Sequence, residues 1–170
     1  MSVMDNFYEI SPNELGNASE LIGNRWMLIT AKDNDKVNAM TASWGCLGVL
    51  WNKPVAVGFV RPQRHTFGLT ENEDRLSLAC LDEDRRDALK LCGTKSGRDM
   101  DKIAAAGLTT ELFDGVPVIC EARTLLICKK LYVGDIEESG FVDRKLLENY
   151  KLADYHRVYV WEIEKVLERR

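Results

Sequence analysis

The sequence predicts a mainly β fold, a closed or partly closed antiparallel barrel with short helices between its strands. Six or more segments combine β-branched, aromatic and aliphatic residues over strand-like lengths, with turn residues between them. These segments do not alternate regularly with long helices, and no G-x-G-x-x-G motif follows a strand. A barrel is therefore favoured over a Rossmann fold.

Six segments are expected to be strands because their residues favour a pleated, half-buried surface. In chain order they are 26–32, 37–43, 55–60, 75–81, 118–133 (one bent strand or two) and 155–166. Turn residues at 33–36 join the first two into a β-hairpin. Pro62 ends the third, because proline removes a hydrogen-bond donor. The stretch 45–54 is expected to be a loop, and 108–113 to be extended.

Short helices are expected between the strands. They cover 11–22, 66–72, 82–92, a short segment before Gly107, and 142–150. The first opens with serine, proline, asparagine and glutamate, which is the pattern of a capped helix start. Gly93 follows the third helix, where glycine commonly ends a helix.

The composition fits one domain of 170 residues. Hydrophobic residues make up 45% of the chain, enough for a sizeable core. The net charge of -4 argues against a general nucleic-acid binder, which normally presents a basic face. The N-terminus lacks a signal pattern, and the most apolar stretch, 44–51, is far too short to span a bilayer. We expect a cytoplasmic protein that binds neither nucleic acid nor membrane.

The cysteines and histidines do not predict a metal site. The five cysteines include no C-x-x-C pair, and each lies in or beside an apolar run. Buried free thiols in a reducing compartment are expected. The only histidines, His65 and His156, are far apart and fit no zinc spacing.

The segment 38–45 offers one side of a flat slot. It reads N-A-M-T-A-S-W-G, and alternation puts neighbouring side chains on opposite faces. Met40 and Trp44 can wall a planar ring, while Thr41, Ser43 and backbone N–H groups, including that of Ala42, can donate hydrogen bonds to it. An ordinary half-buried strand would explain the same residues.

Two basic loops offer an anion site. The first holds Arg61, Arg64, His65 and Thr66, whose arginines suit the charge and geometry of a phosphate. A solvated basic turn is the alternative. Together with the flat slot, this loop indicates a site for a planar ring with a phosphate tail, which we interpret as flavin mononucleotide (FMN).

The second basic loop is expected to open a helix. Ser96 and Asp99 have capping-box spacing, and a helix start alone would explain them. A helix N-terminus also presents free N–H groups to an anion, Gly97 allows close approach, and Arg98 and Lys102 add charge. If the two basic loops meet, they can clamp one phosphate from two sides.

Four motifs in order resemble the flavin reductase-like family of FMN-binding split β-barrels, which includes flavoredoxin. They are N-A-M-T-A-S-W-G (38–45), V-R-P-Q-R-H-T (60–66), S-G-R-D-M-D-K (96–102) and A-D-Y-H-R-V-Y-V-W-E-I (153–163). The resemblance starts near residue 25 and leaves 1–24 as an N-terminal extension of one domain, 1–170. It implies an antiparallel Greek-key barrel with short peripheral helices, and a homodimer with FMN near the subunit interface.

The resemblance also implies a role for each motif. Met40, Thr41, Ala42, Ser43 and Trp44 would line the isoalloxazine ring. The phosphate end would be held by Arg61, Arg64, His65, Thr66, Ser96, Gly97, Arg98 and Lys102. His65 departs from the pattern, because related sequences often have tyrosine there.

Three functions are consistent with such a site. The first is an oxidoreductase that passes electrons from NADH or NADPH through FMN to a flavin or another acceptor, with the hydride chemistry carried by the cofactor. The second is a flavoredoxin-type carrier that exchanges electrons with protein partners. The third is a ligand-binding barrel without a redox role.

Overall fold

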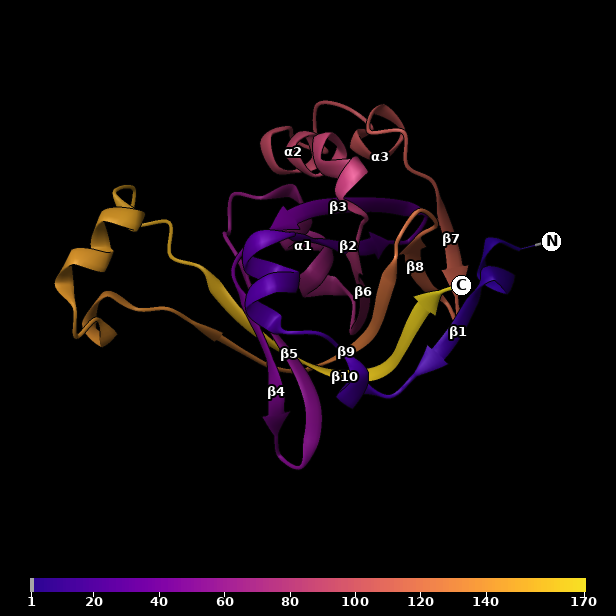
Figure 1. Cartoon of the computed structure of the whole chain (residues 1–170). Coiled ribbons are helices and arrows are strands. Elements are labelled where there is room, and N and C mark those ends of the chain that lie inside the picture. The colour runs from indigo at the N-terminus through magenta and orange to yellow at the C-terminus, as the bar shows by residue number, and fades with distance from the viewer. Residues whose placement is uncertain (1) are drawn as a thin grey trace.

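One antiparallel sheet forms most of the computed structural model, which describes residues 2–170 (Figure 1). Its eight strands are β1 (Phe7–Ile10), β2 (Met27–Asp33), β3 (Lys36–Ala42), β4 (Gly45–Leu50), β5 (Lys53–Val60), β6 (Arg75–Cys80), β9 (Thr124–Asp135) and β10 (Arg157–Arg169). A separate hairpin joins β7 (Thr110–Phe113) to β8 (Val116–Ile119).

The strand order requires the sheet to curl round on itself. The order is β3-β2-β6-β9-β10-β5-β4, with β1 paired to the end of β10. The two edge strands, β3 and β4, are joined by only Ser43 and Trp44. So short a link cannot cross a flat sheet of seven strands, because neighbouring strands lie nearly 5 Å apart. The mainly β, antiparallel split-barrel prediction is confirmed.

Helices are short and lie outside the sheet. They are α1 (His65–Asn72), α2 (Arg86–Thr94) and α3 (Lys102–Ala105). Single turns of 3₁₀ helix cover Val3–Asn6, Pro12–Glu14, Glu83–Arg85, Glu138–Gly140 and the longer Arg144–Tyr150, and a π-helical turn covers Ser19–Asn24. In Figure 1, α2 and α3 lie above β3, so that this strand is covered on its outer face.

Strand β3 is buried on both faces, as its side-chain alternation shows. Met40 and Ala42 belong to the cluster inside the barrel, which also holds Trp161 of β10. Ala39, which precedes Met40 and points to the opposite face, belongs to the second cluster, under α2 and the β7–β8 hairpin. The close packing needs Gly58 on β5, since a Cβ there would lie 2.3 Å from the Trp161 ring.

Two predictions of local structure were wrong. The expected loop at 45–54 is the β4–β5 hairpin, whose turn residues Trp51 and Asn52 both have positive φ. The expected helix over 11–22 begins as predicted, with a capping box between Ser11 and Glu14, but it ends after one turn. The chain is extended at Leu15.

The segment 136–156 leaves the body of the molecule between β9 and β10 (Figure 1). Its expected helix, 142–150, forms as a 3₁₀ helix over Arg144–Tyr150. We call residues 136–156 the projecting segment. Among residues 2–170, no helix has the length and hydropathy that crossing a membrane requires.

Candidate functional site

A pocket of about 180 Å³ lies where β3 passes into β4. We call it the ring pocket. It is lined by Met40, Thr41, Ala42, Ser43, Trp44, Phe59, Arg61, Arg64 and His156. All five residues predicted for the flat slot are therefore on its wall, and two of the predicted basic residues join them.

The hydroxyl groups of the ring pocket differ in their freedom to bind a ligand. The Thr41 hydroxyl donates to the carbonyl of Leu89 at 2.5 Å, and so ties β3 to α2. The Ser43 hydroxyl makes no hydrogen bond to any residue between 2 and 170 and remains available to the pocket. Of the two hydroxyl groups predicted as ring donors, only that of Ser43 is free.

The aromatic side of the ring pocket comes from three elements. Trp44 follows β3, Phe59 lies near the end of β5, and His156 precedes β10. The His156 ring centroid lies 5.3 Å from that of Trp44 and 6.3 Å from that of Phe59. Trp44 is 49% exposed, so its ring stands at the mouth of the pocket.

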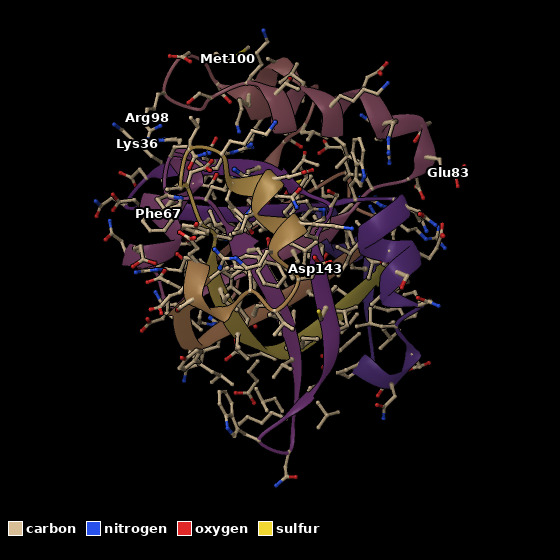
Figure 2. All side chains as sticks on the ribbon, turned by 90° about the vertical axis from the view of Figure 1, so that its left-hand side faces the viewer. Lys36, Phe67, Glu83, Arg98, Met100 and Asp143 are labelled. Carbon is tan, nitrogen blue, oxygen red and sulfur yellow. The ribbon has the colours of Figure 1, made fainter. Side chains whose placement is uncertain are left out.

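A second pocket, of about 470 Å³, lies beside the start of β3. We call it the basic pocket. Its lining includes Lys36, Asn38, His65, Gly97, Arg98 and Lys102, together with the carboxylates of Asp35, Asp99 and Asp101. Figure 2 shows Lys36, Arg98 and Met100 together at this edge of the molecule.

The two basic loops meet, which is the condition for clamping one phosphate from two sides. Arg98 Nη1 donates to the carbonyl of Gln63 at 2.9 Å. Gly97 packs so tightly that a Cβ there would lie 2.4 Å from Asn38 Oδ1 and 2.7 Å from His65 Cδ2. Asn38 in turn donates to the hydroxyl of Thr66 at 2.8 Å, which makes Thr66 a buried brace between β3 and α1.

The predicted capping box of the second loop was wrong. The cap of α3 is Asp101, whose carboxylate accepts from the backbone N–H of Ala104 at 3.1 Å. Ser96 instead accepts from the N–H of Arg98 in the preceding turn. Because α3 begins six residues after Ser96, Lys102 stands at its first position and is buried in the protein.

Lys102 is the most buried cation of the site. Its side chain is 2% exposed, and its ammonium donates to the carbonyl of Cys92 at 3.0 Å. Arg64 donates to the same carbonyl and to that of Gly93, at 3.4 and 3.0 Å. Both cations are thus held at the C-terminal end of α2, where the helix dipole is negative.

The site carries positive charge that its own acids do not pair. Within residues 2–170, none of Lys36, Arg64, His65, Arg98 or Lys102 forms an ion pair. Burial, and then the charge of Arg64, lowers the pKa of Lys102 to about 8. Burial and the surrounding cations lower the pKa of His65 as well. A bound anion would relieve both groups.

Arg61 lies on the ring pocket but is held by the projecting segment. Its guanidinium pairs with Asp154 and donates to the carbonyl of Asn149 at 2.9 Å. It also lies 5.2 Å from the centroid of the Tyr150 ring. Arg61 therefore anchors the wall of the pocket, and its predicted contact with a phosphate stays a prediction.

The two pockets suit the two ends of one ligand. Strand β3 lines both, with Asn38 in the basic pocket and Met40 in the ring pocket. Arg64 and His65, neighbours in the chain, line one pocket each. An aromatic slot beside an unpaired cationic pocket fits a planar ring with a phosphate tail.

Several residues that line these pockets were not predicted as site residues, among them Lys36, Asn38, Phe59 and His156. Lys36 and Asn38 read as turn and strand residues, and Phe59 as a core position of a buried strand. His156 was recognised only as a residue that could face the site. Nothing in the local pattern separates these residues from structural ones; only the fold brings them together.

Solved structures of similar fold come from several organisms. An FMN-binding domain of a flavin reductases-like enzyme from Shewanella baltica is 15% identical, with a TM-score of 0.71 over 96% of this chain and 78% of that one. An FMN-binding protein from Thermus thermophilus, solved with 1-cyclohex-2-enone, is 22% identical, with a TM-score of 0.66 over 94% and 78% of the two chains. Flavoredoxin from Methanosarcina acetivorans is 19% identical, with a TM-score of 0.64 over 84% and 67%.

These likenesses confirm the fold. A search of curated proteins found no match. The family model described as "Flavin reductase like domain" matches residues 20–168, which include both pockets. With nearly the whole chain matched, the protein belongs to the flavin reductase-like family.

Proposed function

We propose that this chain binds FMN, with the isoalloxazine in the ring pocket and the phosphate in the basic pocket. The observation that carries the proposal is that β3 lines both pockets, one aromatic and the other holding cations that form no ion pair within residues 2–170. Two relatives of the same fold are described as FMN-binding, which supports it.

Lys102, Arg98 and His65 would hold the phosphate. Charged donors make the strongest hydrogen bonds to phosphate oxygens, and the buried Lys102 ammonium has donors left after its bond to Cys92. The absence of a side chain at Gly97 keeps the loop close to β3 and the cations together.

Ser43, Trp44 and Phe59 would hold the ring. The Ser43 hydroxyl can donate to a ring oxygen or nitrogen, and the two aromatic side chains exclude water from part of the slot. Thr41 and Thr66 act behind the site, because their hydroxyl groups are bonded to Leu89 and Asn38.

The reaction we propose is that of an NAD(P)H-dependent flavin or FMN reductase. Bound FMN supplies hydride acceptance from NADH or NADPH and electron transfer to a flavin or another acceptor. The residues of this chain bind and orient the ring, keep cations near the phosphate and limit water. No side-chain nucleophile is needed, and we assign no catalytic side chain.

A flavoredoxin-type electron carrier is the second candidate. The half-exposed Trp44 at the pocket mouth favours it, because a protein partner could approach a ring bound beside that side chain. Flavoredoxins from Methanosarcina acetivorans and Desulfovibrio vulgaris share the fold. A ligand-binding barrel without a redox role is the remaining alternative.

We also propose that the protein is a homodimer. The tip of the β4–β5 hairpin exposes Val49 and Trp51, and the Trp51 ring lies 6.4 Å from that of the exposed Tyr132 on β9. Exposed apolar patches of this kind mark association surfaces. The five cysteines are all free thiols, which supports a reducing compartment and thus the cytoplasm.

The visible absorption spectrum of the purified protein tests the proposal, recorded with added FMN and then with NADH or NADPH under anaerobic conditions. A bound flavin spectrum that bleaches quickly supports the reductase. A bound spectrum that persists supports the carrier. A protein that binds no FMN contradicts both and leaves the ligand-binding barrel.

A further inference from the structure

The projecting segment is attached to the ring pocket at its return to the body. Asp154 pairs with Arg61, and Asn149 accepts from the same guanidinium. In Figure 2 this segment, marked by Asp143, faces the viewer in front of the strands. Its last residue, His156, lines the ring pocket.

The His156 ring is buried and bonded on one side. It is 8% exposed, and its Nδ1 lies 2.8 Å from the hydroxyl oxygen of Tyr150, also 8% exposed. The two rings meet edge to face, with centroids 5.5 Å apart. Nε2 of His156 makes no hydrogen bond to any residue between 2 and 170.

The tautomer of His156 follows from the Tyr150 hydroxyl. Within residues 2–170, that hydroxyl has no hydrogen-bond partner other than His156 Nδ1. If Nδ1 carried the proton, the buried hydroxyl hydrogen would have no acceptor, which is costly. The hydroxyl therefore donates to Nδ1, and the imidazole proton resides on Nε2.

We propose that Tyr150 is a positioning residue that fixes His156 as a neutral Nε2–H donor for the ring pocket. The projecting segment then helps to select the ligand, favouring a planar ring that places a carbonyl oxygen or another acceptor against His156. The part of this proposal that concerns the binding of FMN rests on the proposed function. The part that concerns the hydrogen bond between Tyr150 and His156 stands independently of it.

The surroundings of His156 favour the neutral form. Burial, and then the positive charge of Arg61, lower the pKa of His156 to about 4, although Asp154 opposes the shift. Trp44 and Phe59, whose rings also lie near the imidazole, carry no charge. At neutral pH the uncharged imidazole can therefore donate one hydrogen bond from Nε2 to a ligand in the pocket.

Nitrogen-15 NMR of the ligand-free protein tests the pair. The chain has only two histidines, and His156→Gln identifies the signals of this one. In the unmodified protein, we expect the Nε2–H tautomer at pH 7. In Tyr150→Phe, which keeps the ring but removes the donor, we expect a mixture of tautomers. Tyr155→Phe is the control, since the Tyr155 ring packs against that of Tyr150 but its hydroxyl does not hydrogen-bond to the His156 ring.

Titration with FMN separates this inference from the proposed function. We expect Tyr150→Phe to weaken FMN binding by about three- to tenfold, the effect of one neutral hydrogen bond, or to shift the absorption maximum of bound flavin. Tyr155→Phe should do neither. A proton on Nδ1, or a tautomer unchanged in Tyr150→Phe, overturns the inference even if FMN binds. If the NMR result is as expected but the protein does not bind FMN, the hydrogen bond between Tyr150 and His156 is supported and the proposed function is contradicted.

Discussion

Replacing Lys102 by methionine should make the ligand-free protein more stable and its anion site weaker. Methionine has a similar length and no charge. Folding lowers the Lys102 pKa from 10.5 to about 8, and this shift corresponds to roughly 3 kcal/mol of cost for burying the charge. The variant loses the bond to the Cys92 carbonyl, worth about 1 kcal/mol, although Arg64 still donates there. The net gain at pH 7 is about 2 kcal/mol.

Thermal and urea unfolding at pH 7 and pH 10 measure this effect. A gain of about 2 kcal/mol raises the Tm by about 4–8 °C in a chain of this size. Between pH 8 and 10.5 Lys102 binds more protons in the unfolded chain than in the folded one, so the cost of burying this one group falls as pH rises. The advantage of the Lys102→Met variant should therefore be nearly gone at pH 10.

The same variant should bind FMN about ten- to hundredfold more weakly, since a charged contact to phosphate is lost. Lys36→Met is the matched control, because Lys36 lines the same pocket but is exposed. It should change stability by less than about 0.5 kcal/mol. A Lys102→Met protein that is less stable at pH 7, or whose gain does not depend on pH, would refute the reasoning.

Three further substitutions have defined outcomes. Gly97→Ala should weaken FMN binding about tenfold with a small loss of stability, measured by titration and unfolding, because its methyl group displaces Asn38; unchanged affinity would count against the role of this loop. Gly58→Ala should lower the free energy of unfolding by about 1–3 kcal/mol through overlap with Trp161, and a neutral result in urea unfolding would contradict the packing. Trp51→Glu should yield a monomer in analytical ultracentrifugation; a dimer of unchanged affinity would place the interface elsewhere.

Strong alternation and turn chemistry made the fold predictable from the sequence. The β2–β3 hairpin follows from apolar runs around a turn rich in Asp and Asn. The β4 strand was missed for two reasons. It is an edge strand with mostly exposed side chains, and its two-residue turn uses Trp51 and Asn52 at positive φ, where the usual signal is Asn-Gly.

The candidate site was predictable in its motifs and less so in its geometry. Side-chain types indicated that Ser43 and Trp44 lie in a slot, but they left open whether the two basic loops meet, as they do in the structure. They did not show that Thr41 and Arg61 are bonded to other parts of the protein, to α2 and to the projecting segment. Such assignments depend on contacts between residues far apart in the sequence, and local sequence patterns do not reveal these contacts.

The backbone carbonyls at the C-terminal end of α2 explain how the protein folds around buried cations in the absence of a ligand. Buried cations repel one another and lose hydration, so a cluster of them destabilises a folded chain unless acceptors face it. Here the carbonyls of Cys92 and Gly93, at the negative end of a helix, accept from Lys102 and Arg64. Neutral carbonyls offset only part of the positive charge, whereas a carboxylate would cancel it. The remaining charge destabilises the ligand-free protein, and it is this charge that we propose binds the phosphate of FMN.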